Sequence, residues 1–236
     1  MRSRFLWMFA LLWIPVAAQP FASPQARSSA SAAEVEQWRR EAAAGDAEAH
    51  FYLGLCAAEG WRAAPDLDTA LHHFKASAEA GHPWGMNALG YGYLMTRTDL
   101  KEGHRWLKKA SDAQYARAMV NLAWAYGEGL GVDRDEGAAF EWYQKAADLG
   151  DSRGLLGVGM SYQNGWGVEE DPEAAVPFLR RSAELGEAEG QYRYGLALYT
   201  GDGVSRQVKQ GIAWMRKAAA QSFEPAIESL KQLESP

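Results

Sequence analysis

The chain has 236 residues, of which 47% are hydrophobic and 12% aromatic, so it carries enough apolar material for a packed core and is not a disordered polymer. It bears 24 basic and 30 acidic residues, for a net charge of −6. This balance argues against a nucleic-acid or anionic-membrane partner, because both require a basic face.

The N-terminal stretch has the layout of a secretory signal peptide. Arg2 and Arg4 precede an apolar run from Phe5 to Val16, and small residues follow up to Ala18. The run is too short for a bilayer span, which takes roughly 20 residues, so we expect cleavage and no stable membrane insertion afterwards. Cleavage after Ala18 removes two arginines and no acidic residue, which shifts the net charge from −6 to −8. Residues 19–33 are small, polar and proline-bearing, and predict a flexible leader.

From residue 34 to residue 236 the sequence repeats itself. We call the residue that closes each repeat's last predicted helix the anchor, and successive anchors are separated by 36, 33, 36, 36 and 36 residues. The anchors are Gly45, Gly81, Gln114, Gly150, Gly186 and Ser222. Four positions after each anchor stands Gly or Ala, and eight positions after it stands Leu, Val or Tyr. Because intervals of four and eight stay on one face of a helix, each anchor is followed by a helix, which we call helix A.

The residues before each anchor predict a second helix, helix B. In most repeats a bulky pair, such as Trp142 and Tyr143, is followed one turn later by a small pair, such as Ala146 and Ala147. Large side chains of one helix can then pack against small ones of its neighbour. Between the two helices, segments such as Gly129-Leu130-Gly131-Val132 supply glycines for the positive φ that reverses the chain.

Two repeats depart from this pattern. The second has Thr96-Arg97-Thr98-Asp99 in place of the glycine-bearing loop, and the first has Gly60-Trp61-Arg62-Ala63-Ala64-Pro65. The segment 34–44 reads as a leading helix B and the segment 225–233 as a trailing helix A. Atypical elements of this kind are expected at the ends of a repeat array.

The motifs AxxxLG, AYGEGLGVDRD and AFEWYQKAADLG recur in register across residues 34–233. On these motifs the chain resembles the Sel1-like repeat family, which is related to the tetratricopeptide repeats. The resemblance implies an all-α fold, a right-handed α/α superhelical solenoid of about five helix-turn-helix repeats plus terminal half-repeats, with the A helices lining the concave face. It also implies a family of adaptors and scaffolds for protein complexes, many of whose bacterial members are exported.

Residues that invite a catalytic or metal-binding interpretation fall at positions that packing explains. His73 stands where other repeats carry Trp or Phe, and Cys56 stands where they carry Gly, Ala or Ser. The acidic runs 133–136 and 169–171 precede helix B, where carboxylates favour the positive end of the helix dipole. We therefore expect no catalytic residue, no metal and no cofactor.

Two other classes of function stay open. Some exported members of the family that the chain resembles are described as binding or weakly hydrolysing β-lactams. Serine enzymes of that class use an SxxK motif, and no serine in this chain is followed three residues later by lysine. A peptidoglycan or other glycan ligand would use the same aromatic surface as a protein partner.

The face of helix A opposite its apolar stripe is the predicted binding surface. It mixes aromatic rings with Arg and Asn, a composition favoured at protein interfaces. We expect the groove residues to be Tyr52, Tyr91, Arg117, Asn121, Trp124, Arg153 and Arg193. The sequence thus predicts a periplasmic or secreted, non-enzymatic protein that binds a protein or peptide, with the bacterial envelope as its expected setting.

Overall fold

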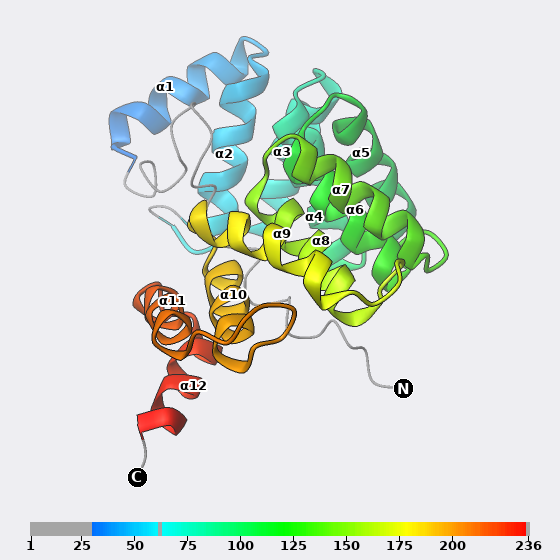
Figure 1. The fold of residues 1–236 in the computed structure, drawn as a ribbon. Coiled ribbons are helices and arrows are strands. Elements are labelled where there is room, and N and C mark those ends of the chain that lie inside the picture. The colour runs from blue at the N-terminus through cyan, green and yellow to red at the C-terminus, as the bar shows by residue number, and fades with distance from the viewer. Residues whose placement is uncertain (1–29, 61–62, 235–236) are drawn as a thin grey trace. The chain divides into compact units, whose positions relative to one another are not determined.

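The computed structural model describes residues 30–60 and 63–234, and within these residues the chain is all helical with no strand (Figure 1). The predicted signal peptide and most of the predicted leader lie outside the described residues. The helices are α1 (Ala32–Ala43), α2 (Ala47–Glu59), α3 (Leu67–Glu79), α4 (Pro83–Thr96), α5 (Leu100–Asp112), α6 (Ala116–Glu128), α7 (Glu136–Asp148), α8 (Ser152–Asn164), α9 (Pro172–Glu184), α10 (Ala188–Thr200), α11 (Val208–Ala220) and α12 (Glu224–Glu234).

The helices pair as the repeat pattern predicts. The A helices of the five repeats are α2, α4, α6, α8 and α10, each followed by its B helix, while α1 and α12 are the terminal half-repeats. The chain forms two compact units, Met1–Ala113 and Gln114–Pro236. Within each unit every described helix packs against the next, and successive A helices also contact one another, as α2 does α4, α6 does α8 and α8 does α10. The prediction of an all-α repeat solenoid is confirmed.

The first helix begins slightly earlier than the sequence pattern suggested. It starts at Ala32, inside the stretch assigned to the leader, because Ser31 and Glu34 form a capping box. The Ser31 hydroxyl accepts from the Glu34 N–H at 3.2 Å, and the Glu34 carboxylate accepts from the Ser31 N–H at 2.7 Å. This reciprocal arrangement satisfies backbone N–H groups that would otherwise lack partners and fixes the start of the helix.

Loop glycines and acidic caps set the limits of the other helices. Gly129, which ends α6, has φ of 70°, and Gly131 has φ of 75°, as the chain reversal requires. At the start of α7 the Asp135 carboxylate accepts from the N–H of Ala138 at 2.9 Å, and Asp171 caps α9 in the same way. The acidic residues before helix B therefore support the helix start, as predicted.

Small residues bring each A helix close to the B helix before it. A Cβ atom built on Gly154 in α8 would lie 2.6 Å from the backbone nitrogen of Ala147 and 2.7 Å from the Ala146 Cβ in α7. The same contact recurs one repeat later between Gly190 and the pair Ser182-Ala183. The small positions of the repeat thus permit a separation that larger side chains would prevent.

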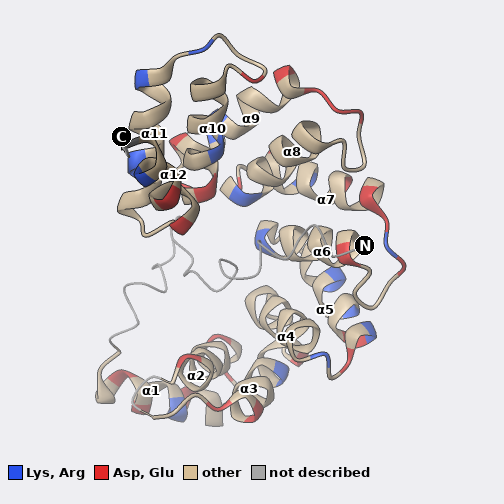
Figure 2. Cartoon of the chain, turned by 90° about the horizontal axis from the view of Figure 1, so that it is seen from below, with Lys and Arg blue, Asp and Glu red and all other residues tan. Residues whose placement is uncertain are grey.

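Charged residues of both signs are spread along the helices instead of gathering by sign (Figure 2). Many form exposed pairs within one helix, such as Lys75 with Glu79 and Arg180 with Glu184. Exposed pairs of this kind add little stability. The positions at which charges are paired between helices are therefore the more informative ones.

Candidate functional site

The predicted binding residues lie on A helices in both units, and each unit is described separately. In the first unit Tyr52 on α2 is buried, and its ring stacks on Trp38 of α1 with centroids 5.0 Å apart. Tyr91 on α4 is half-buried. Tyr52 therefore belongs to the packing between α1 and α2, whereas Tyr91 keeps some exposed surface.

The second unit contains the other five predicted residues, on α6, α8 and α10. Asn121 is 4% exposed and Trp124 is 2% exposed, because α6 is buried along most of its length. Arg117, Arg153 and Arg193 are partly exposed. The surface that a partner could reach on these helices is thus carried by the three arginines more than by Asn121 or Trp124.

Two of the arginines form the same contact one repeat apart. Arg117 Nε on α6 lies 3.9 Å from Asp151 Oδ2 at the start of α8, and Arg153 Nε on α8 lies 3.7 Å from Glu187 Oε2 at the start of α10. The side chains of Arg117 and Arg153 are only 17% and 11% exposed. We call these two pairs the arginine ladder, because they join the A helices α6, α8 and α10 in sequence.

The acid of the first ladder pair also begins a helix. Asp151 Oδ1 accepts hydrogen bonds from the N–H groups of Arg153 at 2.9 Å and Gly154 at 3.0 Å. Its other oxygen faces Arg117. One carboxylate therefore both caps α8 and holds the guanidinium of the preceding A helix.

Arg193 behaves differently from the two ladder arginines. Its partner is Glu189 on the same helix, α10, at 2.7 Å. Asp151 and Glu187 each directly follow an anchor. The residue directly after the next anchor, Ser222, is Phe223, so the ladder has no acidic residue with which to continue. Arg193 is thus held by its own helix instead of by a neighbouring one.

Tyr115, the residue that precedes α6, is influenced by the charges of three residues of the arginine ladder. Burial raises the pKa of Tyr115, Asp151 raises it further, and Arg117 and Arg153 lower it. The net effect is a raised pKa, so the phenol stays neutral at physiological pH and can donate a hydrogen bond.

One B-helix side chain reaches the A helices through the space left by a glycine. A Cβ atom on Gly157 in α8 would lie 2.5 Å from Cγ of Tyr143, so the Tyr143 ring packs directly against the backbone of α8 at this glycine. The Tyr143 hydroxyl is buried and makes no hydrogen bond within the part of the chain that the structure describes. Burial, and then Glu189 and Glu128, raise the pKa of this phenol. The repeat pattern does not single out Tyr143 as a functional residue, although a glycine at a position occupied in the other repeats by Tyr, Ala, Asn or Arg is the signal that could have revealed it.

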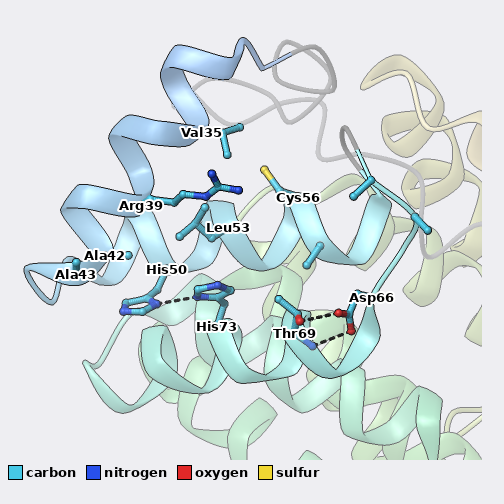
Figure 3. Close-up of a pocket in the computed structure, with 13 residues that line it drawn as sticks. Val35, Arg39, Ala42, Ala43, His50, Leu53, Cys56, Asp66, Thr69 and His73 are labelled. Atoms are coloured by element: carbon cyan, nitrogen blue, oxygen red, sulfur yellow. Dashed lines mark hydrogen bonds between the residues drawn. The ribbon is translucent and has the colours of Figure 1, made fainter.

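The fold also creates a cavity of about 500 Å³ in the first unit, between α1, α2 and α3 (Figure 3). Its polar lining includes Arg39 of α1, His50 of α2 and His73 of α3. The Nδ1 atoms of His50 and His73 lie 3.0 Å apart, a hydrogen bond in which one ring donates and the other accepts. The repeat pattern predicts a packing role for His73 and gives no sign of this hydrogen-bond partner.

Cys56 lines the same cavity. Burial, and then the nearby Glu59, raise the pKa of the thiol to about 11, while Arg39 has a weaker opposite effect. The thiol is therefore protonated near neutral pH and is a poor nucleophile. In the described residues no group of three or more His, Cys, Asp or Glu side chains is placed to hold a metal ion.

Comparisons with known proteins are consistent with this architecture. The Sel1 repeat family model matches residues 47–82, 85–115, 116–151, 152–187 and 188–223. A comparison with curated protein sequences finds no match. Across residues 30–60 and 63–234, no helix has the length and apolar character needed to cross a membrane.

Several solved structures are similar to the chain. A Sel1 repeat protein from Oxalobacter formigenes is 25% identical with a TM-score of 0.75, and the match covers 86% of this chain and 90% of that one. A protective antigen of uropathogenic Escherichia coli with the same repeat fold is 26% identical with a TM-score of 0.57, covering 81% of this chain and 50% of that one. An immunity protein from Pseudomonas aeruginosa is 16% identical with a TM-score of 0.60, covering 89% and 79%, and shows the fold alone.

The paired helices, the recurring anchors and the close packing of A against B define an α/α repeat solenoid. Five consecutive matches to the repeat model cover most of the chain. The chain therefore belongs to the Sel1 repeat family. Proteins of this family are generally non-enzymatic and commonly serve as scaffolds for protein–protein interaction.

Proposed function

We propose that this protein is an exported, non-enzymatic scaffold that binds a protein segment across the A helices α6, α8 and α10. The observation that carries the proposal is the arginine ladder, in which Arg117 and Arg153 are fixed at the same position of successive repeats by an acid of the next repeat. A guanidinium has five N–H donors in a planar fork that matches carboxylate and carbonyl groups, so the part of each arginine that reaches the surface can donate to a bound peptide. A row of fixed donors suits the carbonyl and carboxylate groups of an extended peptide.

Fixing the arginines in advance favours binding. A free arginine loses rotamer entropy when a partner immobilises it, and the contacts to Asp151 and Glu187 have already restricted this freedom. Arg193 and the exposed Leu196 on α10 extend the same surface. The proposal thus assigns polar recognition to the arginines and an apolar contact to Leu196.

Site-specific photo-crosslinking in the native cell tests the choice of face. A photoreactive amino acid at Leu196, on the A helix α10, is expected to capture a defined protein, whereas the same amino acid at exposed Ala213, on the B helix α11, is expected to capture none. Capture of the same protein from both positions would contradict binding at the A helices. Recovery of peptidoglycan fragments from Leu196 would favour the glycan alternative instead.

Affinity measurements with the captured protein then test the arginines. The double substitution Arg117→Ala and Arg153→Ala is expected to weaken binding by about tenfold or more, as for central interface arginines. The matched control removes Arg105 and Arg180, which form exposed pairs within B helices, and is expected to leave the affinity within about twofold. Equal affinity of both double variants would refute the role of the ladder.

Export is a separate part of the proposal and rests on the N-terminal sequence. The expected mature protein begins at Gln19 and is found in the periplasm or the medium. N-terminal sequencing of the protein from fractionated cells checks this, and an intact N-terminus in the cytoplasmic fraction would contradict it.

A further inference from the structure

The cavity of the first repeat lies where other repeats place large side chains. Three positions of the repeat differ in size between the first copy and the later ones. Ala57 stands where Tyr93, Tyr126, Tyr162 and Leu198 stand, Ala63 where Val132, Val168 and Val204 stand, and His73 where Trp106, Trp142, Phe178 and Trp214 stand.

The fourth repeat shows what these positions normally do. There Tyr162 stacks on Phe178, with ring centroids 6.0 Å apart and planes inclined by 23°. The equivalent residues in the first repeat are Ala57 and His73, and both line the cavity. The cavity therefore exists because a side chain that fills the core elsewhere is replaced by a methyl group. Its volume of about 500 Å³ lies in the range of small-ligand sites.

The cavity has a basic end. His50 and His73 are joined through their Nδ1 atoms, so the proton shared between them fixes both rings. Arg39 extends from α1 towards α2 in the same cavity, with its guanidinium beside Leu53 and Cys56 (Figure 3). Arg39 pairs with Glu36 of the same helix at 3.2 Å, and their side chains are 66% and 53% exposed. An ion pair this exposed is weak, so the guanidinium can turn to a ligand at little cost.

The opposite end of the cavity is acidic, and the walls between the two ends are apolar. Asp66 lies at the far side from the histidine pair (Figure 3) and accepts from the Thr69 N–H at 3.0 Å and the Thr69 hydroxyl at 2.7 Å. These contacts lower the pKa of Asp66, so it stays ionised at neutral pH. Apolar residues make up most of the remaining lining: Val35, Ala42, Ala43, Leu53, Ala57, Ala63 and Ala64.

We propose that this cavity binds a small monocarboxylate with an apolar body, its carboxylate held by Arg39 and the His50–His73 pair. Arginine matches a carboxylate through two parallel N–H donors, and the histidine pair adds a polar group next to it. The apolar part of the ligand lies against Leu53 and the alanines. The charge of Asp66 disfavours a second carboxylate at the far end.

The first test is the choice of ligand by the purified protein. Hexanoate is expected to bind at millimolar concentration or below in a calorimetric titration, and hexanamide and adipate about tenfold more weakly, because hexanamide lacks the charge and adipate would place a second charge against the apolar walls. No binding of hexanoate, or equal binding of hexanamide, would overturn the proposal.

The second test fills the cavity with tyrosine, the residue that most other repeats carry at the position of Ala57. Ala57→Tyr restores the side chain found in the second, third and fourth repeats, and is expected to reduce hexanoate affinity at least about tenfold. The control Ala213→Tyr adds the same ring at an exposed position of α11 and is expected to change nothing. Circular dichroism verifies that both variants are folded. Unchanged hexanoate binding by a folded Ala57→Tyr variant would overturn the proposal.

A third variant does not depend on repacking the core. Arg39→Gln is expected to weaken hexanoate about tenfold without affecting hexanamide, whereas Arg40→Gln, one residue further along α1 and outside the cavity lining, has no effect. Equal loss for hexanoate in both variants would refute a role for Arg39.

The source of the carboxylate is decided by one further comparison. An acetylated hexapeptide ending in leucine with a free carboxyl group is titrated beside hexanoate. Tighter binding of the peptide identifies a peptide C-terminus as the source of the ligand, and its exclusion identifies a free acid. Failure of all these probes would leave the proposed binding at the A helices of the second unit unaffected.

Discussion

The Nε atom of Arg117 in α6 lies 3.9 Å from Oδ2 of Asp151, the residue that begins the next A helix. The carboxylate therefore has two partners: the guanidinium of one repeat and the backbone of the following one. Asp151 thus holds α6 against α8 and at the same time caps the first turn of α8.

Substitution of Asp151 separates these two roles. Asp151→Ala removes the cap and the ion pair and is expected to lower the free energy of unfolding by about 1–2 kcal/mol, the usual cost of losing a helix cap. Asp151→Asn keeps a capping oxygen and is expected to cost less than half as much. Urea denaturation followed by circular dichroism measures both. Equal losses would show that the ion pair, and not the cap, dominates.

Gly154 in α8 and Gly150 in the turn before this helix predict a second contrast in stability. Gly154→Ala introduces a methyl group 2.6 Å from the Ala147 backbone, which forces α7 and α8 apart and is expected to cost about 2–3 kcal/mol of stability. Gly150→Ala meets open space, so its cost comes only from the φ of 80° and is about 1–2 kcal/mol. The urea midpoint of Gly154→Ala should therefore be the lower one. The reverse order would contradict the close helix contact.

The buried histidine of the first repeat predicts a dependence of stability on pH. Burial, and then His50 of α2 and His72 of α3, lower the pKa of His73 from its ordinary value of 6.5. Arg39 of α1 lines the same cavity. Between pH 6.5 and the lower pKa of the folded state, the unfolded chain binds more protons than the folded chain. Stability is therefore full above pH 6.5, falls as the pH drops through this window and levels off below it.

His73→Phe, which carries the residue of the fourth repeat, tests this assignment. The variant is expected to lose less free energy of unfolding between pH 7.5 and pH 5.5 than the parent protein. Some dependence remains, because burial also lowers the pKa of His82 and of His104. An unchanged loss in the variant would show that His73 does not titrate as described.

The chemistry of Cys56 is open to direct measurement. Because burial and Glu59 raise its pKa to about 11, the thiolate fraction at pH 7.5 is roughly 100-fold lower than for an ordinary thiol. Alkylation of the native protein by iodoacetamide should be slower than that of the urea-unfolded protein by at least this factor. Equal rates would mean that the thiol is accessible and unperturbed.

The repeat pattern predicts most of the fold, because the residue type at each repeat position is set by the turn, cap or helix contact formed there. The positive φ of Gly129, the cap at Asp135 and the contact of Gly154 with α7 each follow from a residue type at a fixed position. The earlier start of α1 was missed, because the capping box at Ser31 belongs to the end of the array, where the repeat gives no information.

The candidate sites were harder to predict for a physical reason. Counting positions on helix A identifies the face opposite the apolar stripe, but α6 is flanked by α7 on one side and α8 on another. Asn121 and Trp124 are consequently buried although they lie on the predicted face. Their role in binding, like that of the other groove residues, stays a prediction.

The histidine pair escaped sequence analysis because it is a property of two positions together. Nothing in the position of either His50 or His73 along the sequence points to the other, and only the packing of α2 on α3 brings their Nδ1 atoms to 3.0 Å. In the same way the cavity follows from what Ala57 and Ala63 leave unfilled, which a comparison of residue types alone does not measure.

The arginine ladder sets a rule for how this protein can change in length. Arg117 and Arg153 are 36 residues apart, and so are their partners Asp151 and Glu187. Gene duplication or deletion of one whole 36-residue period in the second unit therefore exchanges each ion pair for an equivalent one, whereas an insertion inside a helix between a guanidinium and its acid shifts the two out of register. The number of repeats is accordingly free to evolve in whole steps.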